Sequence, residues 1–380
     1  MFVFVCTGCG AELTAPLDRV ELPVHARQKY GNGLQLPVLM APGTFAVEPE
    51  GWGAPWRGWH EVGPDEAAER GVFAPVPRLS DAPPGAVVIA PGEAHGTVLV
   101  PENRGSGYCC GLDGAGGPNM ACAACGVPVA TRIDDCSLWQ AVWLEPTAVR
   151  GLPVEGAEAA PLTWAEVLAA GERVPPYGPV VSWGDRPRPA TWWSAWSPQW
   201  EAAAGRALAH LLVASGGQPV AVPDGLAAEV FQPALDALLP TGPATRHAVL
   251  AGPDLPVPGA GADVLLVPTH PQTGETWAPA AAHTCAYRVP LPFGVWFALA
   301  FPQADLPDLP AGRLPAGVSR DEDQPLAPPR PHHPFQVDFG ILQQTLVRLP
   351  AVRRPWLRDI LDDTRRHTSA GMIQRGTVLR

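Results

Sequence analysis

The sequence is poor in positive charge. It has a single lysine, Lys29, and its formal net charge is −11. Phosphate binding requires a basic face, so this deficit argues against a general nucleic-acid-binding protein. The sequence also lacks a long apolar run. The longest, Val289 to Phe301, is interrupted by Pro290 and Pro292 and is too short to span a bilayer. We therefore expect neither a nucleic-acid partner nor a membrane partner.

Targeting and nucleotide-binding signals are also missing. Met1–Val5 has no basic residue of the kind that opens a secretory signal peptide, and its composition indicates a strand. Neither a Walker motif nor a GxGxxG motif follows a predicted strand, so nucleotide binding has no local support. The eight cysteines include pairs at metal-binding spacing, which favours metal ligands in a reducing cytoplasm over disulfides.

Two cysteine segments match each other. They are Cys6-Thr7-Gly8-Cys9-Gly10 and Cys122-Ala123-Ala124-Cys125-Gly126, which we name the first and second knuckle. Two residues between the cysteines let a tight turn direct both sulfurs to one point, and the glycine can adopt a positive φ. Similar residues follow at equal offsets: Leu13, Thr14, Ala15, Leu17 and Asp18 after the first, and Val129, Ala130, Thr131, Ile133 and Asp134 after the second. We expect similar strands there.

This duplication resembles the zinc-ribbon group, in which two knuckles on two β-hairpins share one metal ion. The resemblance covers residues 1–18 and 120–136 only. It implies that Cys6, Cys9, Cys122 and Cys125 ligate one zinc ion. Four thiolates leave no open coordination position, so the role would be structural. A redox dithiol is the alternative, but it would lie between a strand and a helix.

The spacing departs from a compact ribbon. Compact double knuckles are separated by about 15–20 residues, whereas 112 residues separate Cys9 from Cys122. Either a β-rich insertion lies between the knuckles, or each knuckle finds other ligands. We predict an α+β chain in five parts: a zinc-ribbon-like β domain (1–146, insertion 19–119), a Pro/Trp-rich connector (147–197), a small α/β domain (198–302), a linker (303–334) and a helical C-terminal segment (335–380).

Two hairpins are predicted in the first domain. One joins Val20–Val24 to Leu34–Val38 through the turn signal at residues 30–33, and the other joins Ala86–Ile89 to Thr97–Val100 through Pro91-Gly92.

After residue 147, the sequence contains three signals for the start of a helix. Thr163 and Glu166 fit a capping box, Ser197-Pro198 opens an amphipathic helix, and Asp224 is expected to N-cap another. Residues 289–301 are expected to form a buried strand or pair of strands.

Other cysteines lie near the second knuckle. Cys109 and Cys110 are adjacent, and Cys136 follows two aspartates. They could be extra metal ligands, a nucleophile, or incidental. A cysteine hydrolase needs a thiolate beside an imidazole, and the sequence places no histidine next to these residues.

Three polar residues each follow a predicted strand of the α/β domain. Asp224, Asp254 and His270 would then lie at the carboxyl ends of parallel strands, where open α/β sheets bind ligands. The simpler interpretation is a cap, a turn residue and a loop residue.

The segment His25 to Lys29 is also rich in cationic groups and could hold an anion. Ordinary salt bridges are the expectation that we favour for it.

Together these patterns favour a non-enzymatic, zinc-binding scaffold or protein-interaction protein with a protein partner. The alternative is an enzyme, either a cysteine hydrolase at Cys109 or Cys110, or a small-molecule enzyme at Asp224, Asp254 and His270. No catalytic motif stands out in the sequence, which is why the first interpretation is preferred.

Overall fold

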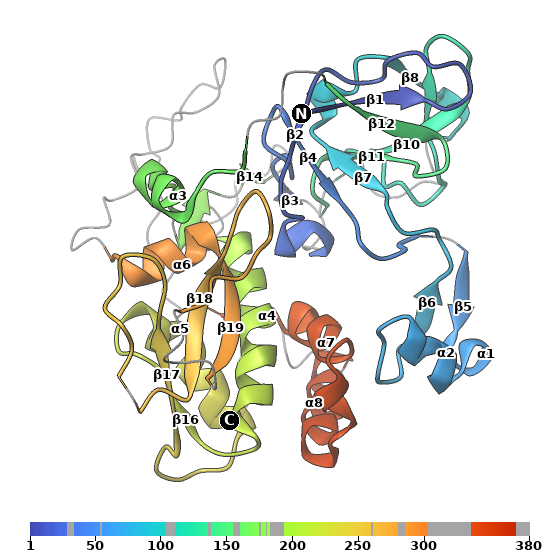
Figure 1. Cartoon of the computed structure of the whole chain (residues 1–380). Coiled ribbons are helices and arrows are strands. Elements are labelled where there is room, and N and C mark those ends of the chain that lie inside the picture. Colours follow the sequence, from blue (N-terminus) through green and yellow to red (C-terminus); the bar gives the residue numbers. More distant parts are fainter. Residues whose placement is uncertain are drawn as a thin grey trace, which may run out of the picture. The chain divides into compact units, whose positions relative to one another are not determined.

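The structure is a computed structural model in which the following residues are described: 1–28, 34–53, 55–103, 111–135, 138–154, 160–174, 176–179, 181–182, 194–259, 261–279, 286–302 and 336–369. These residues form a mixed α+β protein, as predicted (Figure 1). The chain divides into two compact units. The first comprises residues 1–70, 75–162 and 271–274, and the second comprises 71–74, 163–270 and 275–380. The domain boundaries expected from the sequence stay a prediction.

The first unit is built on a seven-stranded sheet. Every neighbouring pair in it is antiparallel except the first. The order across the sheet is β2 (Asp18–Arg19), β4 (Thr44–Val47), β7 (Val87–Ile89), β11 (Ala141–Leu144), β10 (Pro128–Ile133), β9 (Met120–Cys122) and β8 (Thr97–Leu99).

Both faces of this sheet are covered by buried apolar side chains. Successive side chains of a strand point to opposite faces, so one strand can contribute to both. On one face, which we name the aliphatic face, Phe45, Ile89 and Leu144 pack with residues of the first knuckle's strand. On the other, which we name the polar face, Val88 and Ala141 pack against an irregular segment before β4. Strand β7 therefore contributes to two separate cores.

A second, two-stranded sheet carries the N-terminal strand. β1 (Phe2–Cys6) pairs antiparallel with β12 (Val149–Pro153), so that Cys6 lies opposite Val149. β12 falls within the residues expected to be a connector. Its pairing shows that residues from that stretch complete the first unit.

Neither predicted hairpin forms. Val24 begins the 3₁₀ helix η1 (Val24–Arg27), and only Leu34–Gln35 (β3) is extended on the other side. Residues 29–33, including the expected turn, lie outside the described residues. β7 and β8 are both strands, but β7 pairs with β4 and β11, whereas β8 pairs with β9. The chain between them instead passes through the 3₁₀ helix η2 (Pro91–Glu93) and reaches the far edge of the sheet.

A small lobe of the first unit lies between β4 and β7. It consists of β5 (Trp56–Gly58), α1 (Trp59–Val62), α2 (Pro64–Glu69) and β6 (Arg78–Ser80), with β5 antiparallel to β6. Arg57 and Arg70 each form ion pairs with both Glu66 and Asp81. These four side chains form a closed ring that joins α2 to both strands.

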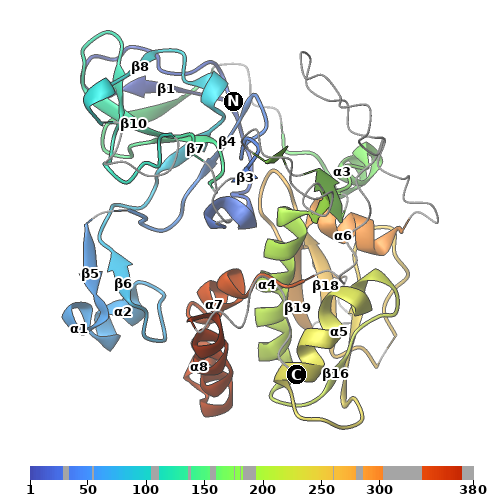
Figure 2. The ribbon, with the colours of Figure 1, turned by 180° about the vertical axis from the view of Figure 1, so that it is seen from behind.

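The second unit contains a four-stranded parallel sheet. Its order is β16 (Val220–Ala221), β17 (Arg246–Leu250), β18 (Val264–Thr269) and β19 (Tyr287–Pro292). The helices α4 (Pro198–Ser215) and α5 (Leu226–Leu238) lie on one face of this sheet, the face toward the viewer in Figure 2. A parallel sheet with helices is the arrangement that alternating helices and strands predict.

Several helix starts follow the sequence signals. Ser197 is the N-cap residue of α4 and Pro198 occupies its first turn. The capping box of α3 (Trp164–Ala170) is complete, because the Glu166 N–H donates to Thr163 Oγ1 and the Thr163 N–H donates to Glu166 Oε2. Such caps satisfy backbone groups that have no partner inside the helix.

Two expectations for the second unit were wrong. The N-cap residue of α5 is Gly225, with φ +90°, and no side chain caps this helix, so Asp224 does not play that role. The apolar run after β19 does not continue as a strand. It forms α6 (Phe293–Ala300), which buries Trp296 completely. A helix that is apolar all round has no polar face to reveal its period.

Two helices follow near the C-terminus, as predicted. They are α7 (Phe339–Leu346) and α8 (Pro355–Ser369), with the 3₁₀ helix η6 (Pro350–Arg353) between them. α7 packs against α4 at Gly205, where any Cβ would collide with the Asp338 carbonyl oxygen. The remaining short elements are η3 (Pro101–Asn103), β13 (Tyr177–Pro179), β14 (Val181–Ser182) and β15 (Ser194–Trp196), of which β13 and β15 pair with each other. Within the described ranges, no helix has the length and apolarity of a membrane span.

Candidate metal centre

The two knuckles have the same backbone geometry. Each begins at the last residue of a strand, Cys6 of β1 and Cys122 of β9. In each, the glycine N–H donates to the carbonyl oxygen of the first cysteine, at 2.8 Å from Gly10 and 2.9 Å from Gly126. The two glycines have φ values of +77° and +75°. A residue with a side chain would be strained there, which explains the CxxCG pattern.

The chain returns from each knuckle in the same way. The Cys6 N–H donates to the Ala11 carbonyl oxygen at 2.9 Å, and the Cys122 N–H donates to that of Val127 at 2.8 Å. Beyond this point the two differ. The second knuckle leads into the regular strand β10, whereas residues 11–17 return along β1 through isolated bridges only. The expectation of two similar strands is therefore correct for the second knuckle and wrong for the first.

The first knuckle has a support that the sequence did not indicate. The Thr7 N–H donates to the Ala148 carbonyl oxygen at 3.0 Å, and its hydroxyl donates to that of Thr147 at 3.4 Å. These residues directly precede β12, the partner of β1. No sequence signal near Thr147 and Ala148 indicates that they contact the first knuckle.

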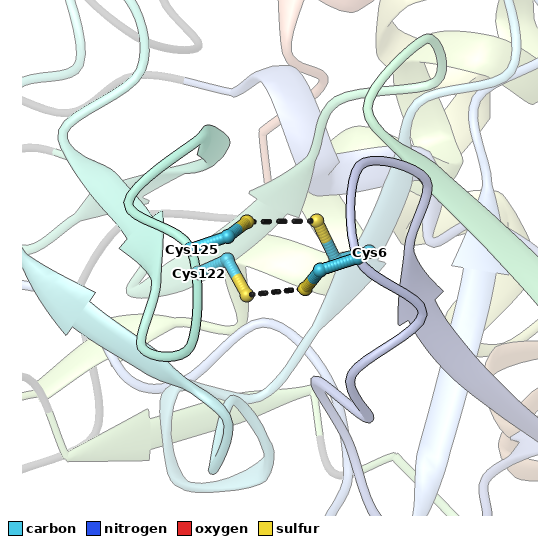
Figure 3. A group of neighbouring side chains, drawn as sticks. Cys6, Cys122 and Cys125 are labelled. Atoms are coloured by element: carbon cyan, nitrogen blue, oxygen red, sulfur yellow. Dashed lines mark hydrogen bonds between the residues drawn. The ribbon is translucent and has the colours of Figure 1, made fainter.

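The two knuckles bring four sulfur atoms together (Figure 3). The Cys6 and Cys125 sulfurs are 3.7 Å apart, as are those of Cys9 and Cys122, and all four lie within 4.8 Å of one another. Tetrahedral ligands about 2.3 Å from one metal ion are about 3.8 Å apart, so the observed spacing fits a site with four cysteine ligands. It is far too long for a disulfide, whose S–S bond is about 2.0 Å.

The thiols differ in how easily they ionise. Burial of the Cys122 sulfur opposes ionisation, but hydrogen bonds from the backbone N–H groups of Ala124 and Cys125 lower its pKa to about 7. The Val127 N–H has the same effect on Cys125, but the neighbouring thiols outweigh it and raise the pKa of Cys125 to about 12. In this cluster of four thiols, Cys122 therefore ionises easily and Cys125 ionises with difficulty. A bound cation would offset the repulsion between neighbouring thiolates.

Comparison with known proteins adds no family to this geometry. Neither a protein-family model, nor a curated protein, nor a solved structure matches the chain. A metal-binding cluster of four cysteines is therefore supported by the structure alone, and membership of the zinc-ribbon group is not shown.

Other cysteines were also candidate site residues. Cys109, Cys110 and Cys136 are outside the described residues, so their proposed roles as ligands or nucleophiles stay predictions. Among the described residues, the four knuckle cysteines are the only group of three or more His, Cys, Asp or Glu side chains placed to share a metal ion.

The three polar residues at the strand ends of the second unit have different surroundings. Asp224 and Asp254 are exposed, and Asp254 adopts a φ of +63° in the turn after β17. His270 is buried, with its ring 5.1 Å from that of Trp164 in an edge-on arrangement. A ligand site formed by these three residues stays a prediction.

In the described part of the cationic segment, residues 25–28, the charged and aromatic side chains pack against other residues. The Arg27 guanidinium forms a buried ion pair with Glu48 and stacks on Trp52, 3.8 Å from the ring centroid. His25 is buried against Trp139, with ring centroids 4.5 Å apart, and burial lowers its pKa to about 3. Salt bridging, the interpretation that we favoured from the sequence, is what Arg27 shows.

Proposed function

We propose that the four knuckle cysteines hold one zinc ion, and that the ion has a structural role in a non-enzymatic protein-interaction or scaffold protein. The observation that carries this proposal is the spacing of the four sulfurs, 3.7 Å within each facing pair and at most 4.8 Å overall. Four thiolates would complete the coordination of zinc and leave no position for water or substrate.

The position of the cluster supports a structural role. The first knuckle begins at the end of β1 in the two-stranded sheet, whereas the second begins at the end of β9 in the seven-stranded sheet. A metal ion would thus link two sheets and close a chain segment of 112 residues. Cross-links that close long segments restrict the unfolded chain strongly, so such an ion would contribute to the stability of the whole first unit.

An interaction role is supported by apolar side chains near the cluster. Val98 and Leu99 on the edge strand β8 are exposed, as is Val127 directly after the second knuckle. Exposed apolar side chains at a sheet edge are candidates for contact with a protein partner. If these residues bind a protein partner, Val98→Glu/Leu99→Glu should keep its metal and lose the partners that the wild-type protein retains in cross-linking.

Elemental analysis tests the metal site directly. We expect about one zinc per chain in wild-type protein purified without chelators. The variant Cys6→Ser/Cys125→Ser removes one ligand from each knuckle and should contain none. The matched control Cys109→Ser/Cys110→Ser should retain it. Tetrahedral thiolate sites also suit iron, so finding iron in place of zinc would correct the metal and keep the site. Zinc retained by the first variant would refute the proposal.

A further inference from the structure

Two of the differences between the knuckles lie at equivalent positions beside the sulfurs. The residue before the second cysteine is Gly8 in the first knuckle and Ala124 in the second. The residue after the knuckle glycine is Ala11 in the first and Val127 in the second. The first knuckle, which has no side chain at its third position, thus faces the second knuckle, which is followed by the larger residue Val127.

Gly8 and Val127 meet directly beside the sulfurs. A methyl group on Gly8 would lie 3.4 Å from Val127 Cγ2, 3.6 Å from Cys6 Sγ and 3.8 Å from Cys125 Sγ. These three atoms, one from each side chain, surround the bare face of Gly8. The Val127 side chain thus lies beside Gly8, on the side of the first knuckle where the Cys6 and Cys125 sulfurs also lie.

The position of Val127 is fixed by its backbone. Its carbonyl oxygen accepts from the Cys122 N–H at 2.8 Å, and its N–H hydrogen-bonds to the Cys125 sulfur. Val127 as a whole residue is nevertheless 38% exposed, and Cys9 and Cys125 are themselves exposed. Val127 is therefore an apolar group held at the boundary between the sulfur cluster and solvent.

We propose that Val127 gates the metal centre: packed against Gly8, its side chain restricts the approach of water and competing ligands to the Cys6 and Cys125 sulfurs. A metal ion leaves a thiolate site when a proton or another ligand displaces a sulfur, and the apolar shell of a site controls that access. This inference rests on the proposed function, because a cluster that binds no metal has nothing to gate.

Metal release tests the gate. We expect the cobalt(II)-loaded Val127→Ala variant to lose its thiolate-to-metal absorption to excess EDTA on the order of fivefold faster than wild type, because two methyl groups leave this contact. The double variant Gly8→Ala/Val127→Ala should release the metal more slowly than Val127→Ala, since the new methyl refills the space beside both sulfurs. Gly8 does not have a positive φ, and Ala124 occupies the equivalent position, so alanine fits there.

The control and the opposing outcomes are distinct. Val257→Ala makes the same substitution at an exposed valine of the second unit and should release the metal at the wild-type rate. Wild-type protein that binds no cobalt would overturn the metal site itself. Metal-binding protein in which Val127→Ala changes nothing would overturn the gate alone. If Val127→Ala releases the metal faster and the added Gly8→Ala substitution does not slow that release, the gate would also be overturned. The faster release would then come from a knuckle whose backbone has become less ordered.

Discussion

The two faces of the seven-stranded sheet are built on different physical principles. The aliphatic face is filled by phenylalanine, leucine, isoleucine and valine side chains and ends at the cysteine cluster. The polar face has a smaller apolar core, and the segment over it buries His25 and the ion pair between Arg27 and Glu48. The aliphatic face is stabilised by the burial of apolar side chains and by a candidate metal ion. The polar face depends more on a buried ion pair and a buried histidine. We therefore expect metal removal to destabilise the packing on the aliphatic face, and acid or loss of the ion pair to destabilise the packing on the polar face.

Loss of the metal should have the largest effect, and on the aliphatic face. Structural zinc sites contribute on the order of 10 kcal/mol, comparable with the whole stability of a domain. We expect EDTA treatment, or Cys6→Ser/Cys125→Ser, to abolish the calorimetric transition of the first unit and to leave that of the second unit in place. A single transition that shifts as a whole would show that the two units do not unfold separately.

Removing Glu48 should have the next largest effect, on the polar face. Its side chain is 4% exposed and that of Arg27 is 16% exposed, so Glu48→Ala leaves a buried guanidinium without its carboxylate. Breaking such a pair costs about 3–5 kcal/mol. Denaturant unfolding measures this loss. Glu48→Leu combined with Arg27→Met should recover most of it, and a loss that persists in the double variant would assign the effect to packing.

Acid should weaken the polar face through His25. Because burial lowers the pKa of His25 to about 3, against an ordinary value of 6.5, the unfolded chain binds the proton more readily. The stabilisation is thus complete above pH 6.5 and is lost as the pH falls toward 3. At pH 5 the expected loss is about 2 kcal/mol. His25→Phe should remove this slope between pH 6.5 and 5, provided that metal content is constant. An unchanged slope would assign it to other groups.

The smallest effect is expected where an ion pair is exposed. The side chains of Arg57 and Glu66 in the lobe ring are 33% and 38% exposed, so solvent screens their attraction. Glu66→Gln should lower the unfolding midpoint far less than Glu48→Gln does. Urea unfolding of the two variants measures both losses. Because each substitution removes the same charge, a difference between them reports the effect of burial. Equal losses would mean that the closed ring, in which each group has two partners, compensates for its exposure.

The sequence predicted those features whose cause is local. The knuckles follow from two cysteines, two spacer residues and a glycine, and the capping box of α3 follows from Thr163 and Glu166. The cysteine pairs were also expected to meet, because the two segments duplicate one pattern. The knuckles and the capping box depend on residues close together in the chain, and the meeting of the cysteine pairs was predicted across a long separation only because the pattern is repeated.

What the sequence did not predict depends on distant partners. Nothing in Val87–Ile89 says that its neighbours are β4 and β11 in place of β8. The apolar residues of α6 carry no alternation that separates helix from strand. The contact between Gly8 and Val127 likewise joins residues that are far apart in sequence and is visible only once the knuckles face each other.

The pairing of β1 with β12 also sets an order of events during synthesis. β12 leaves the ribosome about 140 residues after β1, which at about 5–20 residues per second is a delay on the order of ten seconds. Because the second knuckle precedes β12 in the sequence, the first knuckle lacks the other two thiols for most of this time and its partner strand for all of it. The two thiols of the first knuckle and the apolar strand β1 are therefore synthesised well before the residues that complete the cysteine cluster and the two-stranded sheet, so we expect the first unit to reach its complete fold only after β12 has emerged.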